Sequence, residues 1–190
     1  MKVKEIVSEA LVCINAGDKV DVFNNYVNGQ TEGVASADIK LFSHIKRLAI
    51  NCLKEIAVNY TPFIKTERMV GNNGFVPFSQ FTLNAVKIIK AESEVGVPVH
   101  YTKSVEGLYA DKDVFNVTYC YMPSVNEWED EVCALECGIP LRAISCLTAG
   151  EYFIVNGDYT AGNVWRQKFC EYMSGLADRI NISVKRRRWV

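Results

Sequence analysis

SADIKLFSHIKRLAINCLKEIAVNYTPFIKTERMV, residues 36–70, contains both structural patterns of the chain. From 37 to 59, apolar residues recur at spacings of three and four behind Ser36 as an N-cap, which predicts a long amphipathic helix. Pro62 disfavours helical backbone in the residue before it, so the helix should end near Tyr60. The residues that follow, 63–70, are rich in β-branched and aromatic side chains and are typical of a strand. A helical part of the chain therefore changes into a β-rich part here.

The N-terminal side of this stretch predicts one more helix and a loop. Residues 3–16 carry apolar side chains on one face, and Gly17 follows as a stop signal. The stretch DVFNNYVNGQTEGVAS, 21–36, mixes aromatic residues with Asn and Gly. That composition favours a structured loop, or a hairpin around Asn28 and Gly29.

The C-terminal side predicts a small antiparallel β-region from Thr61 to about Met122. Its segments alternate apolar and polar residues and are rich in β-branched and aromatic side chains. The predicted strands lie in FIKTERMV, NAVKIIKAES, VPVHYTKS, GLYAD and DVFNVTYCYMP, the last with Phe115, Val117, Tyr119 and Tyr121 on one face. GNNG at 71–74 and EVGVP at 94–98 supply turns.

Helical periodicity returns near the end of the chain. Pro140 suits the first position of a helix that continues to Val155, and Asn156-Gly157 suits its C-cap. Asp158 can cap a second helix with one apolar stripe, and so short a connection predicts an antiparallel helical hairpin. At helical spacing, the aromatic residues of that stripe are interpreted as core rather than as a platform for bases. They are Trp165, Phe169 and Tyr172.

These elements predict an α+β fold in which a helical bundle, made of N-terminal helices and a C-terminal helical hairpin, carries an inserted small antiparallel β-region. With 190 residues and 49% hydrophobic content, the chain can bury a core as a single domain over 1–190. The predicted parts are a helical bundle from 1–60 and 138–181, a β-rich insertion over 61–125 and an extended basic tail over 182–190.

Composition excludes several classes of protein. The net charge is −1 although four cations lie together near the C-terminus, so the remainder is mildly acidic and a general nucleic-acid surface is not favoured. Glu5 and Glu9 interrupt the N-terminal apolar residues, so we expect no signal peptide, and no apolar run reaches membrane-spanning length. The seven cysteines include no CxxC and are interpreted as buried reduced thiols rather than metal ligands.

Motifs that would indicate an enzyme are missing from the sequence. It contains no GxxxxGK[ST] phosphate loop, no strand followed by GxGxxG, no HExxH and no GxSxG. A cysteine nucleophile with His44 or His100 as base stays open, because such pairs need only proximity in space. We expect both histidines to be structural, and we expect no enzyme activity, no cofactor and no metal.

Two charged segments are the candidate sites. The acidic segment NEWEDEVCALE, 126–136, is interpreted as a solvated surface or a partner for cations, and the basic C-terminal tail places a bulky aromatic residue directly after four cations. The acidic candidates are Glu127, Glu129, Asp130 and Glu131, and the tail candidates are Lys185, Arg186, Arg187, Arg188, Trp189 and Val190. If one subunit's acidic segment contacted the tail of its neighbour, the heterologous contact could close into a ring.

Four stretches together resemble a known family. AGEYFIVNGDYTAGNVWRQKF at 149–169 follows VTYCYMP at 117–123 and precedes the terminal RRRWV, and FSHIKRLAINCLKEIAVNYTPFIKTE occupies 42–67. In this order they resemble the head-to-tail connector (adaptor, head-completion) proteins of tailed bacteriophages. The resemblance is sharpest over 149–169.

The resemblance implies a virion structural protein with a helical bundle and a β-region. Identical subunits, commonly twelve, would form a ring below the portal, continue the channel through which genomic DNA passes, and join capsid to tail. The implied partners are the portal protein, tail or neck proteins and further copies of the chain, with no membrane. The implied location is the virion neck, after synthesis in the host bacterial cytoplasm.

If the chain is such a connector, we expect its tail to dock on a neighbouring subunit or on the portal, with Trp189 as apolar anchor. Three alternatives stay open. The chain could be a neck or tail-completion protein at another level of the channel, a nucleic-acid-binding or regulatory protein that uses the basic tail, or a small enzyme with a reactive cysteine.

Overall fold

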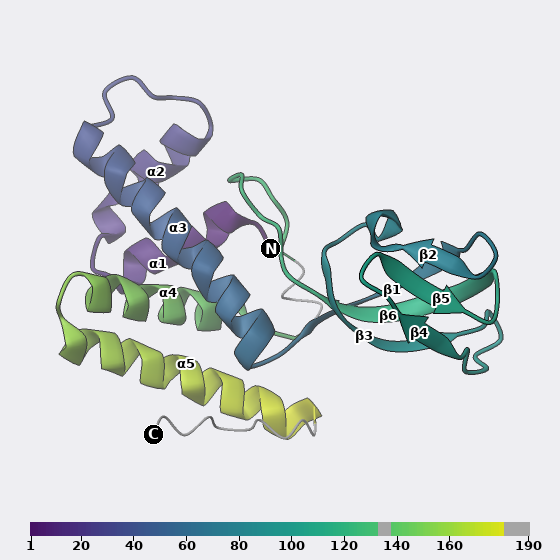
Figure 1. Cartoon of the computed structure of the whole chain (residues 1–190). Coiled ribbons are helices and arrows are strands. Elements are labelled where there is room, and N and C mark those ends of the chain that lie inside the picture. The colour runs from purple at the N-terminus through teal and green to yellow at the C-terminus, as the bar shows by residue number, and fades with distance from the viewer. Residues whose placement is uncertain (133–137, 181–190) are drawn as a thin grey trace. The chain divides into compact units, whose positions relative to one another are not determined.

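The computed structural model describes residues 1–132 and 138–180, and within them the chain forms five α-helices and two three-stranded antiparallel sheets (Figure 1). The predicted mixed α+β class is therefore confirmed. The chain divides into two compact units, a helical unit made of 1–56 with 125–190 and a β unit made of 57–124. Among the described residues, no helix combines the length and apolarity that crossing a membrane requires.

The helical unit is built around its fourth helix. Its elements are α1 (Val3–Cys13), the 3-10 turn η1 (Gly17–Lys19), α2 (Val20–Val27), α3 (Ser36–Asn59), α4 (Leu141–Val155) and α5 (Tyr159–Ile180). Helix α4 packs against α1 and against α5, which lies beside it (Figure 1). Residues 143–150, AISCLTAG, are all buried, which is the behaviour of a helix segment with no charged residue on any side.

Two glycines let α4 and α5 approach closely. A Cβ atom on Gly162 would lie 2.5 Å from Ile154 Cγ1 and 3.0 Å from the carbonyl oxygen of Gly150. The turn between the helices has the predicted caps: Gly157 adopts φ 86°, and Asp158 Oδ1 accepts a hydrogen bond from the Ala161 amide at 2.9 Å. Pro140 differs slightly from the prediction, because it is the N-cap of α4 and not its first helical residue.

The predicted loop or hairpin over 21–36 is wrong for its first part, which forms α2. This helix is held by Phe23, which is fully buried and meets the ring of Phe42 at 5.1 Å between centroids. Tertiary packing of one aromatic residue thus prevails over the weak helix propensity of the Asn residues around it. Helix α3 begins at Ser36 itself, and Ala35 accepts the hydrogen bonds of its first turn, so Ser36 is not the residue before the helix.

The β unit consists of two sheets. The larger has the order β1-β6-β3 and the smaller β2-β5-β4, with all neighbours antiparallel. The strands are β1 (Phe63–Val70), β2 (Phe75–Pro77), β3 (Ala85–Glu92), β4 (Tyr101–Lys103), β5 (Gly107–Ala110) and β6 (Val114–Tyr121), and the 3-10 turn η2 (Phe78–Gln80) follows β2. Strand β2 was not predicted, and the segment VPVHYTKS contributes only its residues 101–103.

The sequence predicted correctly which side chains of β6 form the buried face of the larger sheet. The four alternating residues of β6, from Phe115 to Tyr121, are buried. The turn at 71–74 is also confirmed, because Gly74 has φ 75° and a Cβ atom there would lie 2.2 Å from the carbonyl oxygen of Ala110. Gly96, in the predicted turn at 94–98, has φ 80°.

Candidate functional site

The structure describes residues 126–132 of the predicted acidic segment, and its residues 133–136 lie outside the described part of the chain. The acidic residues 127–131 lie within the helical unit, whereas the basic tail candidates, 185–190, lie outside the described residues. The acidic segment makes defined contacts with the N-terminal residues of the chain.

Backbone atoms of the acidic segment form hydrogen bonds with the start of α1. The Val3 amide donates to the Asp130 carbonyl at 3.2 Å, and the Lys4 amide donates to the Trp128 carbonyl at 3.0 Å. In the reverse direction, the Val132 amide donates to the Met1 carbonyl at 2.7 Å. The first amides of a helix have no partner within the helix, so these bonds satisfy groups that would otherwise need water.

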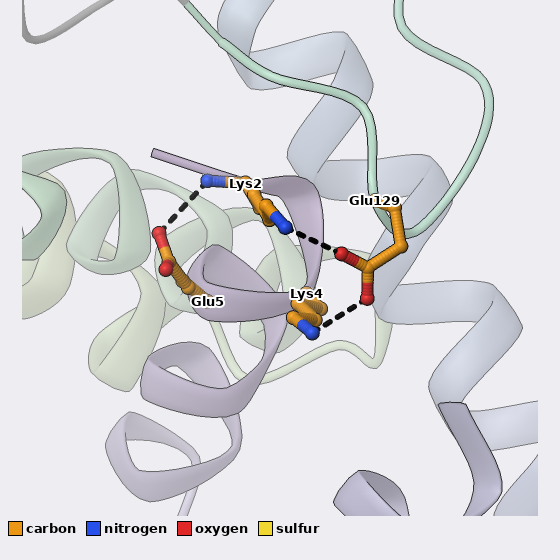
Figure 2. Close-up of polar contacts among 4 residues, drawn as sticks. All are labelled: Lys2, Lys4, Glu5 and Glu129. Carbon is orange, nitrogen blue, oxygen red and sulfur yellow. Dashed lines mark hydrogen bonds and ion pairs between the residues drawn. The ribbon is translucent and has the colours of Figure 1, made fainter. Parts of the chain in front are cut away.

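Side-chain charges strengthen the same contact (Figure 2). Glu129 lies between two lysines, with its Oε2 atom 2.7 Å from Lys2 Nζ and its Oε1 atom 2.5 Å from Lys4 Nζ. Hydrogen bonds from Lys2 and Lys4 lower the pKa of Glu129. The Lys2 amide donates to Glu5 Oε2 at 2.8 Å, and the Glu5 amide donates to the Lys2 carbonyl at 3.1 Å, so Glu5 makes the backward bond of a capping box while the Lys2 side chain, which has no acceptor, makes none.

Asp130 and Trp128 hold the acidic segment in shape. Asp130 Oδ2 accepts hydrogen bonds from the backbone amides of Asn126 at 2.7 Å and Glu127 at 2.9 Å, and these bonds, first the one from Glu127, lower its pKa. The Trp128 ring meets Phe23 at 5.3 Å between centroids, and Lys46 Nζ lies 4.5 Å from its centre. The conformation of this loop is therefore fixed by its own hydrogen bonds and by the packing of the Trp128 ring.

The four predicted acidic residues divide into two pairs. Glu129 and Asp130 bond to other groups of the chain, although Glu129 is itself exposed, and Glu127 and Glu131 are exposed as well. The sequence could not show the role of Glu129, because its partners Lys2 and Lys4 lie more than 120 positions away, whereas the bonds of Asp130 are local.

A second feature of the helical unit was missed by sequence reasoning. Helices α4 and α5 border a hollow of about 460 Å³, lined by Arg142, Cys146, Trp165, Lys168, Glu171 and Tyr172. The prediction that the aromatic stripe is core holds for Phe169, which is fully buried, but is wrong for Tyr172, which is 42% exposed. Trp165 is half-buried at the margin of the stripe. Because α4 covers a single face of α5, side chains at the edges of that face remain at the surface.

The polar side chains of this hollow have defined partners. Arg142 forms an ion pair with Glu9 of α1. Lys168 Nζ lies 4.0 Å from the centre of the Trp165 ring, which is a cation–π contact. The hollow thus combines cationic and aromatic surface with the sulfur of Cys146.

The cysteines are more varied than predicted. Cys13, Cys52 and Cys146 are buried free thiols, as expected, whereas Cys120 is half-buried and Cys170 is exposed. Cys13, at the end of α1, and Cys146, in the middle of α4, lie on helices that pack against each other. Within residues 1–132 and 138–180, no group of three or more His, Cys, Asp or Glu side chains could hold a metal ion.

The two histidines lie in different units. His44 Nδ1 is 3.1 Å from Arg47 Nη2, its ring meets Tyr152 at 6.1 Å, and burial followed by the charge of Arg47 lowers its pKa. His100 is exposed, and its carbonyl accepts a hydrogen bond from the Asp111 amide. The side-chain contacts of His44 agree with a structural role, whereas the bond at His100 involves only its backbone and leaves the role of its side chain a prediction.

Comparison of the chain with protein-family models and with curated protein sequences finds no match.

Proposed function

We propose that this chain is a head-to-tail connector adaptor of a tailed bacteriophage, a virion structural protein without catalytic activity. In this proposal, identical copies form a ring below the portal, continue the DNA channel and join the capsid to the tail. The observation that carries the proposal is the order of elements, in which N-terminal helices, a contiguous β unit and two paired C-terminal helices follow one another. The same order is implied by the resemblance of residues 42–67, 117–123 and 149–169 to that family.

The finer architecture belongs to the same proposal. We infer that α1, α3 and the α4–α5 pair act as a helical bundle, with α4 and α5 as an antiparallel hairpin and the β unit as its insertion. The buried stretch 143–150 and the close approach of Gly150 to Gly162 support a rigid helical body. A rigid body is what a ring of repeated contacts needs, since each subunit must present the same surfaces to its neighbours.

The charged segments supply a candidate contact between neighbouring subunits. Glu127 and Glu131 are exposed on a loop that its own backbone bonds and Trp128 hold in place. In the proposal, the tail cations 185–188 of a neighbour pair with these carboxylates, and Trp189 anchors the tail on that neighbour or on the portal.

The mass of the purified protein tests the ring. Native mass measurement of the chain alone and with a candidate portal protein should show a ring on the portal, with about twelve copies if the family pattern holds. A chain that stays monomeric both alone and with every portal and neck candidate would refute the proposal.

Variants of the tail test its mode of action. Trp189→Ala should abolish assembly on the portal while all four cations remain, because a docking tail needs its apolar anchor. A nucleic-acid-binding protein would behave differently: it would bind duplex DNA with an affinity that falls steeply with salt, and Trp189→Ala would leave that binding in place. Loss of DNA binding on replacing the four cations with Gln, with assembly unchanged, would favour this second function.

A further inference from the structure

The two edges of the larger sheet are built differently. Strand β1 forms one edge and pairs with β6 along its whole length without a shift in register. Strand β3 forms the other edge, and its pairing with β6 shifts register between Ala85 and Lys87 and again between Ile88 and Lys90. Irregular edges of this kind hinder the addition of a further strand, whereas a long regular edge permits it. Of the two edges, β1 is therefore the one on which another strand can pair.

The register of β1 shows which of its backbone groups face outwards. The Gly71 amide, one position beyond β1 in the same register, donates to the Asp113 carbonyl at 2.6 Å. Hydrogen-bonded pairs alternate along an antiparallel ladder, so the odd-numbered residues of β1 bond to β6 and the even-numbered residues turn their amides and carbonyls away from it. Thr66 and Thr118 agree with this assignment, because their hydroxyls lie 2.9 Å apart and side chains approach most closely in the pairs without backbone bonds.

The outward-facing residues of β1 form an open edge. They are Ile64, Thr66, Arg68 and Val70, and all four also expose their side chains. Within residues 1–132 and 138–180, the sheet places no strand beyond β1, and no hydrogen bond reaches the amides or carbonyls of these four residues. The edge thus offers unpaired backbone groups next to the exposed apolar side chains of Ile64 and Val70.

We propose that this edge is a dimerisation surface, on which β1 of a second copy of the chain pairs antiparallel about a two-fold axis at Thr66. Such a contact uses the same residues of both copies and closes with two of them. The inference does not rest on the proposed connector function, because the ring contact proposed above uses the charged segments of the helical unit.

Charge favours a second copy as the partner and selects the register. In a pairing centred on Thr66, Lys65 of each copy lies opposite Glu67 of the other, and opposite charges that face each other stabilise a strand pair. A pairing centred on Lys65, on Glu67 or on Arg68 would instead place two like charges opposite each other. Lys65 and Glu67 already lie 2.6 Å apart within one copy, so the dimer would bring together four charges of alternating sign.

Mass and amide exchange of the unmodified chain test the dimer. In sedimentation measurements at rising protein concentration, without any other protein, we expect the mass of the chain to double. Under the same conditions, the amides of Ile64, Thr66 and Arg68 should become protected from hydrogen exchange, because they bond to the second copy. A chain that stays monomeric would overturn the proposal, and so would a dimer in which these three amides exchange as fast as in the monomer.

A proline at the centre of the edge separates pairing with a second copy from pairing with β6. The Thr66 amide faces outwards, so Thr66→Pro removes a donor that β6 does not use, and the doubled mass should be lost. Protected amides at Lys65 and Glu67 would show that β1 still pairs with β6 in this variant. Thr66→Ala is the matched control, because it keeps the amide, and it should still dimerise. If Thr66→Pro dimerised with β1 still paired to β6, the edge would be the wrong surface.

Exchanged charges test the register. Lys65→Glu alone should raise the concentration needed for dimer formation by about tenfold, because each dimer would then contain two pairs of opposed carboxylates. Glu67→Lys alone should do the same through opposed ammonium groups. A mixture of the two variants should form a mixed dimer at the original concentration, since every facing pair is again of opposite charge. Two folded variants whose mixture dimerises no better than either alone would refute this register, and the exchange of the unmodified chain decides the edge itself if a variant fails to fold.

Discussion

The two units of this protein differ in which parts of the sequence build their cores. The β unit is one continuous segment, 57–124, and every strand pair in it joins residues of that segment. The helical unit needs both sides of the insertion, because α1 packs on α4 and the first residues of the chain bond to the loop at 128–132. The β unit can therefore form from local contacts, whereas the helical unit can form only when distant segments meet.

The difference also shows in what limits close packing. In the β unit, Gly107 and Gly74 face backbone atoms of a neighbouring strand, which cannot move away. In the helical unit, the closest atom to the position of a Cβ on Gly162 belongs to the Ile154 side chain. The sheet is thus less tolerant of added atoms than the pair of helices.

Removing a large core side chain should give the largest effect and should show whether the units are independent. Phe115→Ala in β6 and Phe169→Ala in α5 each remove a fully buried ring, and each should cost about 4 kcal/mol of stability. Hydrogen exchange resolved along the chain should show lost protection mainly in 57–124 for the first variant and mainly in the helical unit for the second. Equal loss in both units for either variant would mean that they unfold together.

Single added methyl groups should give the next largest effect. Gly107→Ala places a Cβ 2.3 Å from the Val76 carbonyl oxygen and should cost about 3 kcal/mol. Gly162→Ala should cost less, about 2 kcal/mol, because the Ile154 side chain can shift and alanine favours the helix.

The matched control for these two variants lies on the same helix as Gly162. A Cβ on Gly175 would meet nothing within 4 Å, so Gly175→Ala should stabilise the protein by up to about 1 kcal/mol. Denaturant midpoints measure all three variants. If Gly107→Ala proved as mild as Gly175→Ala, the sheet would be more deformable than its backbone contacts indicate.

The parts of the fold that the sequence predicted are those with local signals. The limits of β1 follow from Pro62 and the turn at 71–74, and the two C-terminal helices follow from the Asn156-Gly157 turn and the Asp158 cap. Helix α2 was missed because the ring contacts that hold it, those of Phe23 and Tyr26, are tertiary. The ion pairs of Glu129 and the packing of α1 on α4 join segments far apart in the sequence, and a single sequence carries no signal for such pairings.

Acid should weaken the β unit through Glu67. Its Oε1 atom lies 2.6 Å from Lys65 Nζ, and its Oε2 atom accepts a hydrogen bond from the Thr82 amide at 3.2 Å. Burial raises the pKa of Glu67, but the ion pair with Lys65 and the hydrogen bond from the Thr82 amide prevail and lower it to about 2. A lowered carboxyl pKa adds stability above the unfolded value, about 4.3, and that stability is lost as the pH falls towards 2.

The expected contribution of Glu67 is on the order of 2 kcal/mol at neutral pH. Glu67→Gln should lower the stability of the β unit at pH 7 and should remove most of its change between pH 5 and pH 2. Urea unfolding followed by hydrogen exchange in 57–124 measures both. An unchanged acid dependence in Glu67→Gln would assign it to other carboxylates of the sheet.

The smallest expected effect belongs to Glu129, which ties the two segments of the helical unit together at the surface. The lowered pKa of Glu129 adds stability at pH values above the ordinary pKa of glutamate, and this stability is lost as the pH falls through the lowered pKa. The raised pKa of Lys2 adds stability at lower pH, and this stability is lost as the pH rises through the raised pKa. Both groups are exposed, so salt should screen the contact. Glu129→Gln should speed amide exchange at Val3 and Lys4 at low salt, whereas Glu127→Gln, the matched control on the same loop, should not. Equal effects of the two variants would mean that the Lys2–Glu129–Lys4 charges do not strengthen the backbone bonds to Trp128 and Asp130.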